Sequence, residues 1–99
     1  MKVAAIQHDI VWLDREANFA RIEPMVAEAA DNGARLAVLS EMFSTGFAMG
    51  DEWVGRLAEP RGGASSRFLV AMAAKHGLWL AGSCPETGDG STLPANTLV

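Results

Sequence analysis

The sequence predicts an α/β fold in which parallel strands alternate with helices. Two runs in which every residue is apolar, 36–39 and 78–81, are typical of strands that are covered on both faces. Upstream of each run lies a segment whose apolar residues are spaced by three and four, as in amphipathic helices. A strand, a helix and a second strand in this order close with the strands parallel and the connection right-handed.

The first half of the chain is expected to form a strand and a long helix. The strand is expected over residues 2–8, which begin with a short apolar run. The helix is expected over residues 15–31, with Asp14 as its N-cap and Asn32-Gly33 at its end. Pro24 lies inside this helix. Because an interior proline removes a hydrogen bond and costs roughly 3 kcal/mol, we expect a kink or a helix in two pieces there.

The second half repeats the alternation of strands and helices. In order, the expected elements are a strand over residues 35–40, a loop over 42–63, a helix that ends at His76, a strand over 78–81, a turn over 86–94 and the start of a strand over 95–99. Ser65 or Ser66 is suited to cap the second helix. The loop and the turn are predicted from their glycines and prolines, which favour turns over regular structure.

The composition indicates one small domain, residues 1–99, in the cytoplasm. A hydrophobic content of 49% argues against disorder. The net charge is −4 without any cluster of Lys or Arg, which argues against a nucleic acid or an anionic membrane as partner. The longest apolar run, 68–74, is far shorter than the ~18 residues of a membrane-spanning helix. The single cysteine, Cys84, fits a reducing compartment because it cannot close an intrachain disulfide.

Glu41 is the leading candidate for a catalytic residue. Ligands of parallel α/β sheets bind beyond the carboxyl ends of the strands, and Glu41 directly follows the second predicted strand. A carboxylate held there, partly removed from water, is suited to act as a general base. The structural alternative is a strand-end carboxylate that caps the next segment or pairs with an arginine.

The other candidates are weaker. Phe43 and Phe47 are expected either to line a substrate pocket beside Glu41 or to pack in the core. His8, His76 and Cys84 do not have the spacing of zinc ligands, so we expect structural roles for them and no metal site.

Residues 39–47, Leu-Ser-Glu-Met-Phe-Ser-Thr-Gly-Phe, resemble the first signature of the nitrilase-type carbon–nitrogen hydrolases. Ser40 departs from the pattern, since this family usually has proline there. Other segments resemble later or flanking landmarks of the family in the same order: Ile6-Gln7, Asn18, 34–39, 65–69, 76–83, Pro85-Glu86 and 96–99.

The resemblance implies the N-terminal part of a four-layer α-β-β-α sandwich, assembled as a homodimer or higher homo-oligomer. It also implies a hydrolase that cleaves the C–N bond of a small amide without a cofactor, through a Glu, a Lys and a Cys. Glu41 matches the glutamate, the general base that activates the cysteine thiol. The matching lysine and cysteine are expected beyond residue 99, because Cys84 does not match the position of the nucleophile.

The form Met-Phe-x-x-Gly-Phe after Glu41 most resembles the omega-amidase branch of the family. Aliphatic amidase, nitrilase and carbamoyl-amide hydrolase activities remain open. So do two alternatives of another class: a catalytically inert small α/β binding or interaction domain, and an unrelated α/β fold of the flavodoxin type.

Overall fold

The structure is a computed structural model of the chain and describes residues 1–47, 56–87 and 94–99. Its elements are β1 (Lys2–Ile6), α1 (Arg15–Asp31), β2 (Ala34–Leu39), α3 (Ala64–His76), β3 (Trp79–Ala81), β4 (Ser83–Thr87) and β5 (Pro94–Leu98). The strands β1, β2 and β3 form a parallel sheet in that order, while β4 and β5 form an antiparallel pair. The predicted α/β class is therefore confirmed. Parts of the predicted loop over 42–63 and turn over 86–94 lie outside the described residues.

The first helix has the predicted bounds and the predicted cap. The Oδ1 atom of Asp14 accepts a hydrogen bond from the backbone N–H of Ala17 over 3.0 Å. The helix continues through Pro24, so the prediction of two helical pieces is wrong. Ile22 and Val26, both fully buried, lie on either side of the proline in sequence. Their packing in the core stabilises both turns, and such tertiary packing outweighs local propensity.

The end of β1 and the start of α3 differ from the prediction. The strand β1 ends at Ile6 instead of residue 8, because its partner β2 ends opposite it at Leu39. The helix α3 begins at Ala64 with Gly63 as its N-cap and no side-chain capping bond, so neither Ser65 nor Ser66 is the cap. The backbone N–H of Ser65 instead donates to a carboxylate from outside the helix, as described below.

The strand β4 was not predicted. We expected the third strand to run over 78–81 and a turn to begin at residue 86, but the chain returns to extended structure after Gly82. Beyond the pairing of β4 with β5, the backbone of Gly82 exchanges two hydrogen bonds with Val99, of 2.9 and 3.2 Å. The pairing partners of β4 thus lie further along the chain, and no local sequence pattern indicates this pairing.

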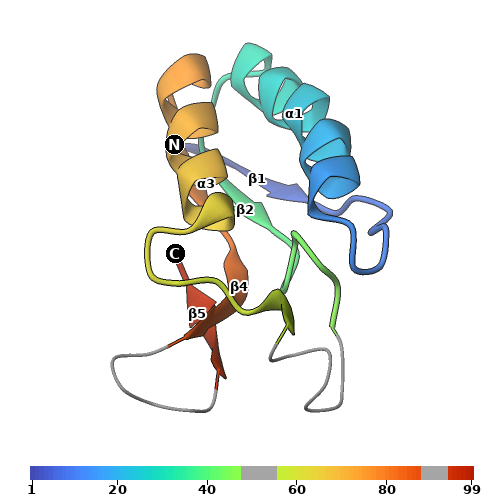
Figure 1. Cartoon of the computed structure of the whole chain (residues 1–99). Coiled ribbons are helices and arrows are strands. Elements are labelled where there is room, and N and C mark those ends of the chain that lie inside the picture. The colour runs from blue at the N-terminus through green and yellow to red at the C-terminus, as the bar shows by residue number, and fades with distance from the viewer. Residues whose placement is uncertain (48–55, 88–93) are drawn as a thin grey trace.

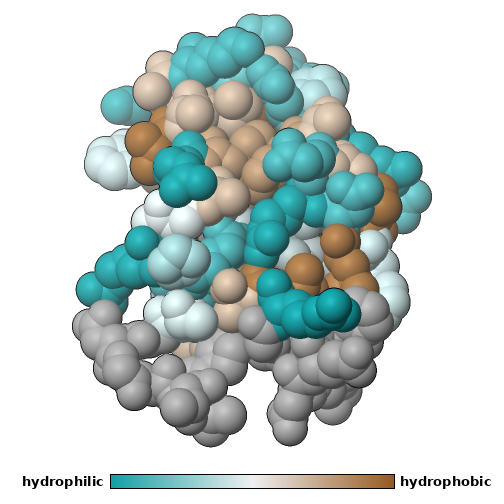
Figure 2. Space-filling view, in the orientation of Figure 1, coloured by the Kyte–Doolittle hydropathy of each residue, from teal (hydrophilic) through white to brown (hydrophobic). Residues whose placement is uncertain are grey.

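Both helices cover the same face of the parallel sheet (Figure 1). Side chains alternate along a strand, so Ala37 and Leu39 of β2 point into the core between sheet and helices. In the core the rings of Phe19 and Phe68 stack at 4.3 Å, and the ring of Phe43 lies 6.2 Å from that of Phe68. On the face that Figure 2 shows, hydrophilic residues alternate with patches of apolar residues. Within the described ranges, no helix has the length and apolar character to cross a membrane.

The opposite face of the sheet, here called the open face, is also apolar. The strand register brings together its residues: Val3, Ala5, Leu36, Val38, Trp79 and Ala81. Val3 is 53% exposed and Trp79 is 77% exposed, so the described residues leave this face uncovered. The sequence predicted strands covered on both faces, and this structure covers only one.

The close contact between Gly82 and Phe43 gives a test of this packing. A Cβ atom on Gly82 would lie 2.7 Å from Cδ1 and 3.0 Å from Cε1 of the fully buried Phe43 ring. We expect Gly82→Ala to lower the free energy of unfolding by about 1–3 kcal/mol. The matched control, Val70→Ala on the outer face of α3, should change it by less than about 0.5 kcal/mol. Urea unfolding measures both, and equal stability of the two variants would contradict the packing described.

Candidate active site

The segment that follows β2, residues 41–47, forms a tight turn and is here called the β2 loop. The backbone N–H groups of Thr45 and Gly46 both donate to the carbonyl of Met42, over 3.2 and 2.8 Å. Met42 has a φ of 52°, in the left-handed region that residues other than glycine rarely adopt. Such conformations persist where the surroundings impose them, and they cluster at functional sites.

The surroundings of the β2 loop do impose its conformation. The backbone N–H of Met42 donates to Oγ of Ser83 over 3.0 Å, and that of Phe43 donates to the Ser83 carbonyl over 3.3 Å. On the other side, the backbone N–H of Leu13 donates to the carbonyl of Thr45 over 2.8 Å. The loop is therefore held between the chain before α1 and the start of β4.

Asn18 attaches the loop to α1 and is a residue whose role the sequence did not reveal. Its Nδ2 donates to the carbonyls of Ser44, over 2.8 Å, and Val11, over 2.7 Å. Its Oδ1 accepts from the backbone N–H of Val11 over 2.7 Å. The side chain is fully buried with its amide satisfied. One signal was present: an asparagine four residues before Ile22, on the apolar face of the helix.

His8 supports the loop from the end of β1. Its Nε2 lies 3.1 Å from the carbonyl of Phe43. Since a carbonyl only accepts, Nε2 is the donor. Burial lowers the pKa of His8 more than the hydrogen bond to this carbonyl raises it, so the imidazole is neutral at pH 7. This contact agrees with the structural role predicted for His8.

Glu41, the first residue of the β2 loop, lies at the carboxyl edge of the sheet as predicted. The side chain is exposed, which differs from the expectation that it is partly removed from water. The reason is its position beyond Leu39, the last paired residue of β2, outside the core under the helices. Its Oε1 accepts a hydrogen bond from Nδ2 of Asn96 on β5 over 2.6 Å.

The two phenylalanines of the loop lie in different surroundings. Phe43 is fully buried in the core, near Phe19 and Phe68, and has no surface with which to line a substrate pocket. Its position agrees with the alternative that Phe43 packs in the core. Phe47 is 64% exposed at the other end of the loop and remains available for contact with a ligand.

The structure also contains a buried carboxylate that the sequence analysis missed. Nε of Arg15 lies 2.9 Å from Oε2 of Glu59, which is 5% exposed. The backbone N–H of Ser65 donates to Oε1 of Glu59 over 2.6 Å, and the Ser65 hydroxyl donates to Oε2. Oγ of Ser65 also lies 2.8 Å from Oγ of Ser44 in the β2 loop. These residues, Arg15, Ser44, Glu59 and Ser65, are here called the Glu59 cluster.

The Glu59 cluster joins elements rather than forming a reaction site. Both carboxylate oxygens have donors and the side chain is closed to solvent. The backbone of Glu59 is fixed as well, because its N–H donates to the carbonyl of Pro85 over 2.8 Å. No local signal marks Glu59, since its charged partner Arg15 lies 44 residues away.

Cys84 on β4 is fully buried and is not a nucleophile in this structure. Burial raises the pKa of its thiol from 9.0 to about 11, and the carboxylates of Glu59 and Glu86 add to the rise. The thiol therefore stays protonated at neutral pH, whereas the reactive form of cysteine is the thiolate. The structural role predicted for Cys84 is confirmed.

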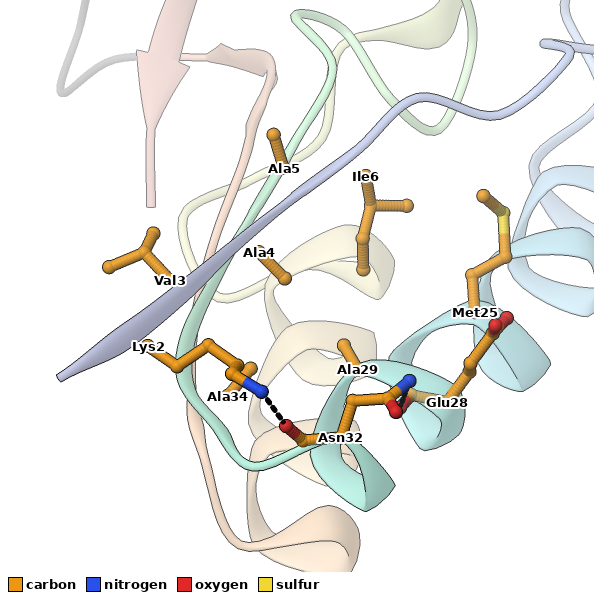
Figure 3. Close-up of a pocket in the computed structure, with 10 residues that line it drawn as sticks. All are labelled: Lys2, Val3, Ala4, Ala5, Ile6, Met25, Glu28, Ala29, Asn32 and Ala34. Carbon is orange, nitrogen blue, oxygen red and sulfur yellow. Dashed lines mark hydrogen bonds between the residues drawn. The ribbon is translucent and has the colours of Figure 1, made fainter.

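An open cavity of about 240 Å³ lies between β1 and α1, and Glu41 is not among its lining residues (Figure 3). Its wall is largely aliphatic, and at its end Nζ of Lys2 donates to the carbonyl of Asn32 over 2.5 Å. The lining holds neither a cysteine nor a histidine. Over the described ranges, no three His, Cys, Asp or Glu residues are grouped to hold a metal ion. The β2 loop is therefore the best candidate for the active site.

Comparison with known proteins shows the family to which the chain belongs. Residues 2–99 match the model of the carbon–nitrogen hydrolase family. The chain belongs to this family. A relative in Pseudomonas protegens, named hydrolase in pqqF 5′ region, is 37% identical over 100% of this chain and 34% of its own length. The nitrilase of Pyrococcus abyssi is 33% identical over 90% of this chain and 35% of its own length.

The omega-amidase NIT2 of Danio rerio is 34% identical over 77% of this chain and 27% of its own length. The 99-residue chain thus spans about a third of the length of the curated relatives that it matches.

Solved structures show the same fold. A CN-hydrolase superfamily protein of Xanthomonas campestris covers 97% of this chain with a TM-score of 0.79 and 23% identity, over 34% of its own chain. A mutant of the amidase from Nesterenkonia sp. AN1, with acrylamide added at its active site cysteine, covers 84% of this chain. Its TM-score is 0.64 at 24% identity, over 32% of its own chain. These similarities establish that the chain has the fold of about a third of each of these two structures, and the flavodoxin-type alternative is set aside.

The buried ion pair of the Glu59 cluster can be tested against a surface pair. We expect Glu59→Ala to lower the free energy of unfolding by roughly 3–5 kcal/mol, because it leaves Nε of Arg15 and the Ser65 N–H without an acceptor. Glu59→Gln, which keeps an acceptor, should lose less. The control is Glu23→Ala, which removes the exposed partner of Lys75 at 2.7 Å and should leave the unfolding midpoint nearly unchanged. Similar midpoints for Glu59→Ala and Glu23→Ala would contradict a structural role for the cluster.

The burial and raised pKa of Cys84 predict low thiol reactivity. With a pKa of about 11, only on the order of one thiol in a thousand is ionised at pH 8. We expect a thiol reagent to label Cys84 in the folded 99-residue chain at least about 100 times more slowly than in urea. The Cys84→Ala variant gives the background signal. Equal labelling rates in the folded and unfolded chain would show that the thiol is accessible and ionised.

Proposed function

We propose that residues 1–99 form part of an amidase-type carbon–nitrogen hydrolase in which Glu41 is the general base. The observation that carries this proposal is the position of Glu41. It starts a loop at the carboxyl edge of a parallel sheet, and this loop is held by hydrogen bonds that Asn18 and Leu13 donate and that Ser83 accepts. Its carboxylate is open to a substrate, while the backbone that carries it is fixed.

In the proposed reaction, Glu41 takes the proton of a cysteine thiol. The thiolate attacks the carbonyl carbon of the amide, and a lysine stabilises the oxyanion of the tetrahedral species. The C–N bond breaks, the proton held by Glu41 goes to the leaving nitrogen, and a thioester remains on the cysteine. Glu41 then takes a proton from water, whose oxygen attacks the thioester carbon. The C–S bond breaks, the acid is released, and the proton held by Glu41 returns to the cysteine sulfur. The fixed backbone of the β2 loop keeps the base in place through both steps.

The mechanism also needs a nucleophilic cysteine and a lysine. Cys84 is buried and protonated, so the nucleophile is a different cysteine. We assign this cysteine and the lysine to the two thirds of the relatives' length that this chain does not span. A homo-oligomeric assembly and a cytoplasmic location, expected from the sequence, form part of the same proposal.

The substrate class proposed is a small amide of the omega-amidase type. Two observations favour it: the Met-Phe-x-x-Gly-Phe form of the β2 loop, and the similarity to a relative that is named omega-amidase. Phe47, exposed at the end of the loop, is the residue proposed to contact the substrate. Nitriles are the competing substrate class, because one of the relatives is named nitrilase. A panel of small amides and nitriles therefore has to be assayed.

The test of the proposal is Glu41→Gln in the full-length protein. Because general-base catalysis contributes about 10²–10⁴-fold, we expect ammonia release from the best substrate of the panel to fall by at least this factor. The exposed side chain makes few packing contacts, so the melting temperature should not change. The control, Glu28→Gln on α1, removes another exposed carboxylate and should keep full activity. Retained activity in Glu41→Gln would remove Glu41 from the mechanism, whereas a wild-type protein that releases no ammonia from any substrate of the panel would favour the inert binding domain.

A further inference from the structure

One polar contact joins Glu41 to a residue that the proposed mechanism does not use. Nδ2 of Asn96 donates to Oε1 of Glu41 over 2.6 Å, across 55 residues of sequence. A carboxylate only accepts hydrogen bonds, so the amide nitrogen of Asn96, and not its oxygen, faces Glu41. The acceptor is charged, and such charge-assisted bonds are shorter and stronger than those between neutral groups.

The antiparallel register of β4 and β5 places Asn96 beside Glu41. Asn96 pairs with Pro85, and its neighbour Thr97 pairs with Cys84. Paired residues share a face of the sheet and successive residues alternate, so Thr97 lies on the face of the buried Cys84. Asn96 therefore lies on the opposite face, away from the core under the helices. A shift of one residue in this register would remove the contact.

The paired strands β4 and β5, here called the β4–β5 hairpin, hold different parts of the β2 loop. At the start of β4, Ser83 accepts the backbone N–H groups of Met42 and Phe43, the two residues after Glu41. On β5, Asn96 holds the carboxylate itself. The backbone and the side chain of Glu41 are thus fixed relative to one hairpin, although Glu41 is exposed.

We propose that Asn96 is a positioning residue that holds Oε1 of Glu41 and leaves Oε2 as the oxygen that accepts the proton. This inference rests on the proposed role of Glu41 as general base. Among the described residues no hydrogen bond to Oε2 is present, and we assign this oxygen to the reacting thiol or water. A glutamate side chain at the surface otherwise samples many rotamers. A base must come within ~2.6–3.2 Å of the proton donor, and a misplacement of about 1 Å can cost 10²-fold in rate.

The test compares Asn96→Ala, Asn96→Asp and Thr97→Ala in the full-length enzyme. For Asn96→Ala we expect kcat to fall about 10- to 100-fold while KM changes less than about threefold. The reason is that the variant no longer holds Glu41 in position, whereas the contacts that bind the substrate are unchanged. Asn96→Asp keeps the shape but replaces the donor with a second carboxylate, so its kcat should be lower still. Thr97→Ala alters the same strand without touching Glu41 and should keep kcat within twofold of the wild type. Thermal melting shows whether each variant is folded.

Each result bears on the inference. A wild-type kcat in Asn96→Ala, in an enzyme that Glu41→Gln inactivates, would overturn the role of Asn96 and leave Glu41 as the base. Equal losses in Asn96→Ala and Thr97→Ala, or a higher kcat in Asn96→Asp than in Asn96→Ala, would also overturn it, because a general weakening of the hairpin would then explain the loss. An active Glu41→Gln variant would overturn both proposals.

Discussion

The arrangement of this structure depends on the burial of one carboxylate, that of Glu59. A charge removed from water needs an opposite charge and hydrogen bonds to all of its acceptor sites. Glu59 obtains these from Arg15 of α1 and Ser65 of α3, while its backbone bonds to β4. Ser65 continues the contact to Ser44 of the β2 loop. These elements therefore cannot shift independently, because a shift of any one would leave a buried polar group unsatisfied.

The candidate active site makes use of this rigidity. Met42 holds a left-handed backbone conformation that costs on the order of 1 kcal/mol in a residue other than glycine. Asn18, His8 and Ser83 hold the residues around it through their hydrogen bonds. Glu41 is attached to this fixed loop, so an exposed carboxylate keeps a defined place. The same organisation explains why a fully buried phenylalanine and a surface glutamate lie two residues apart.

Part of the fold was predictable because the relevant signals are local. The helix over residues 15–31 has its N-cap, its apolar spacing and its terminal glycine within one segment, and the structure has the same bounds. The prediction of a serine cap for α3 was wrong because the acceptor comes from outside the helix. The carboxylate of Glu59 accepts the hydrogen bond from the backbone N–H of Ser65, which the side chain of an N-cap residue would otherwise accept. The strand β4 was missed because its pairing with β5 spans residues that no short pattern connects.

The sequence by itself determined the α/β class, the order of the elements from β1 to β3 and the place of Glu41 at the end of β2. These follow from apolar runs, periodicity and caps, which act between residues close in the chain. Only the tertiary structure decided that Phe43 lies in the core, that Glu59 is buried beside Arg15, and that Asn96 meets the carboxylate of Glu41. These contacts join residues tens of positions apart, so they depend on how the elements pack and pair.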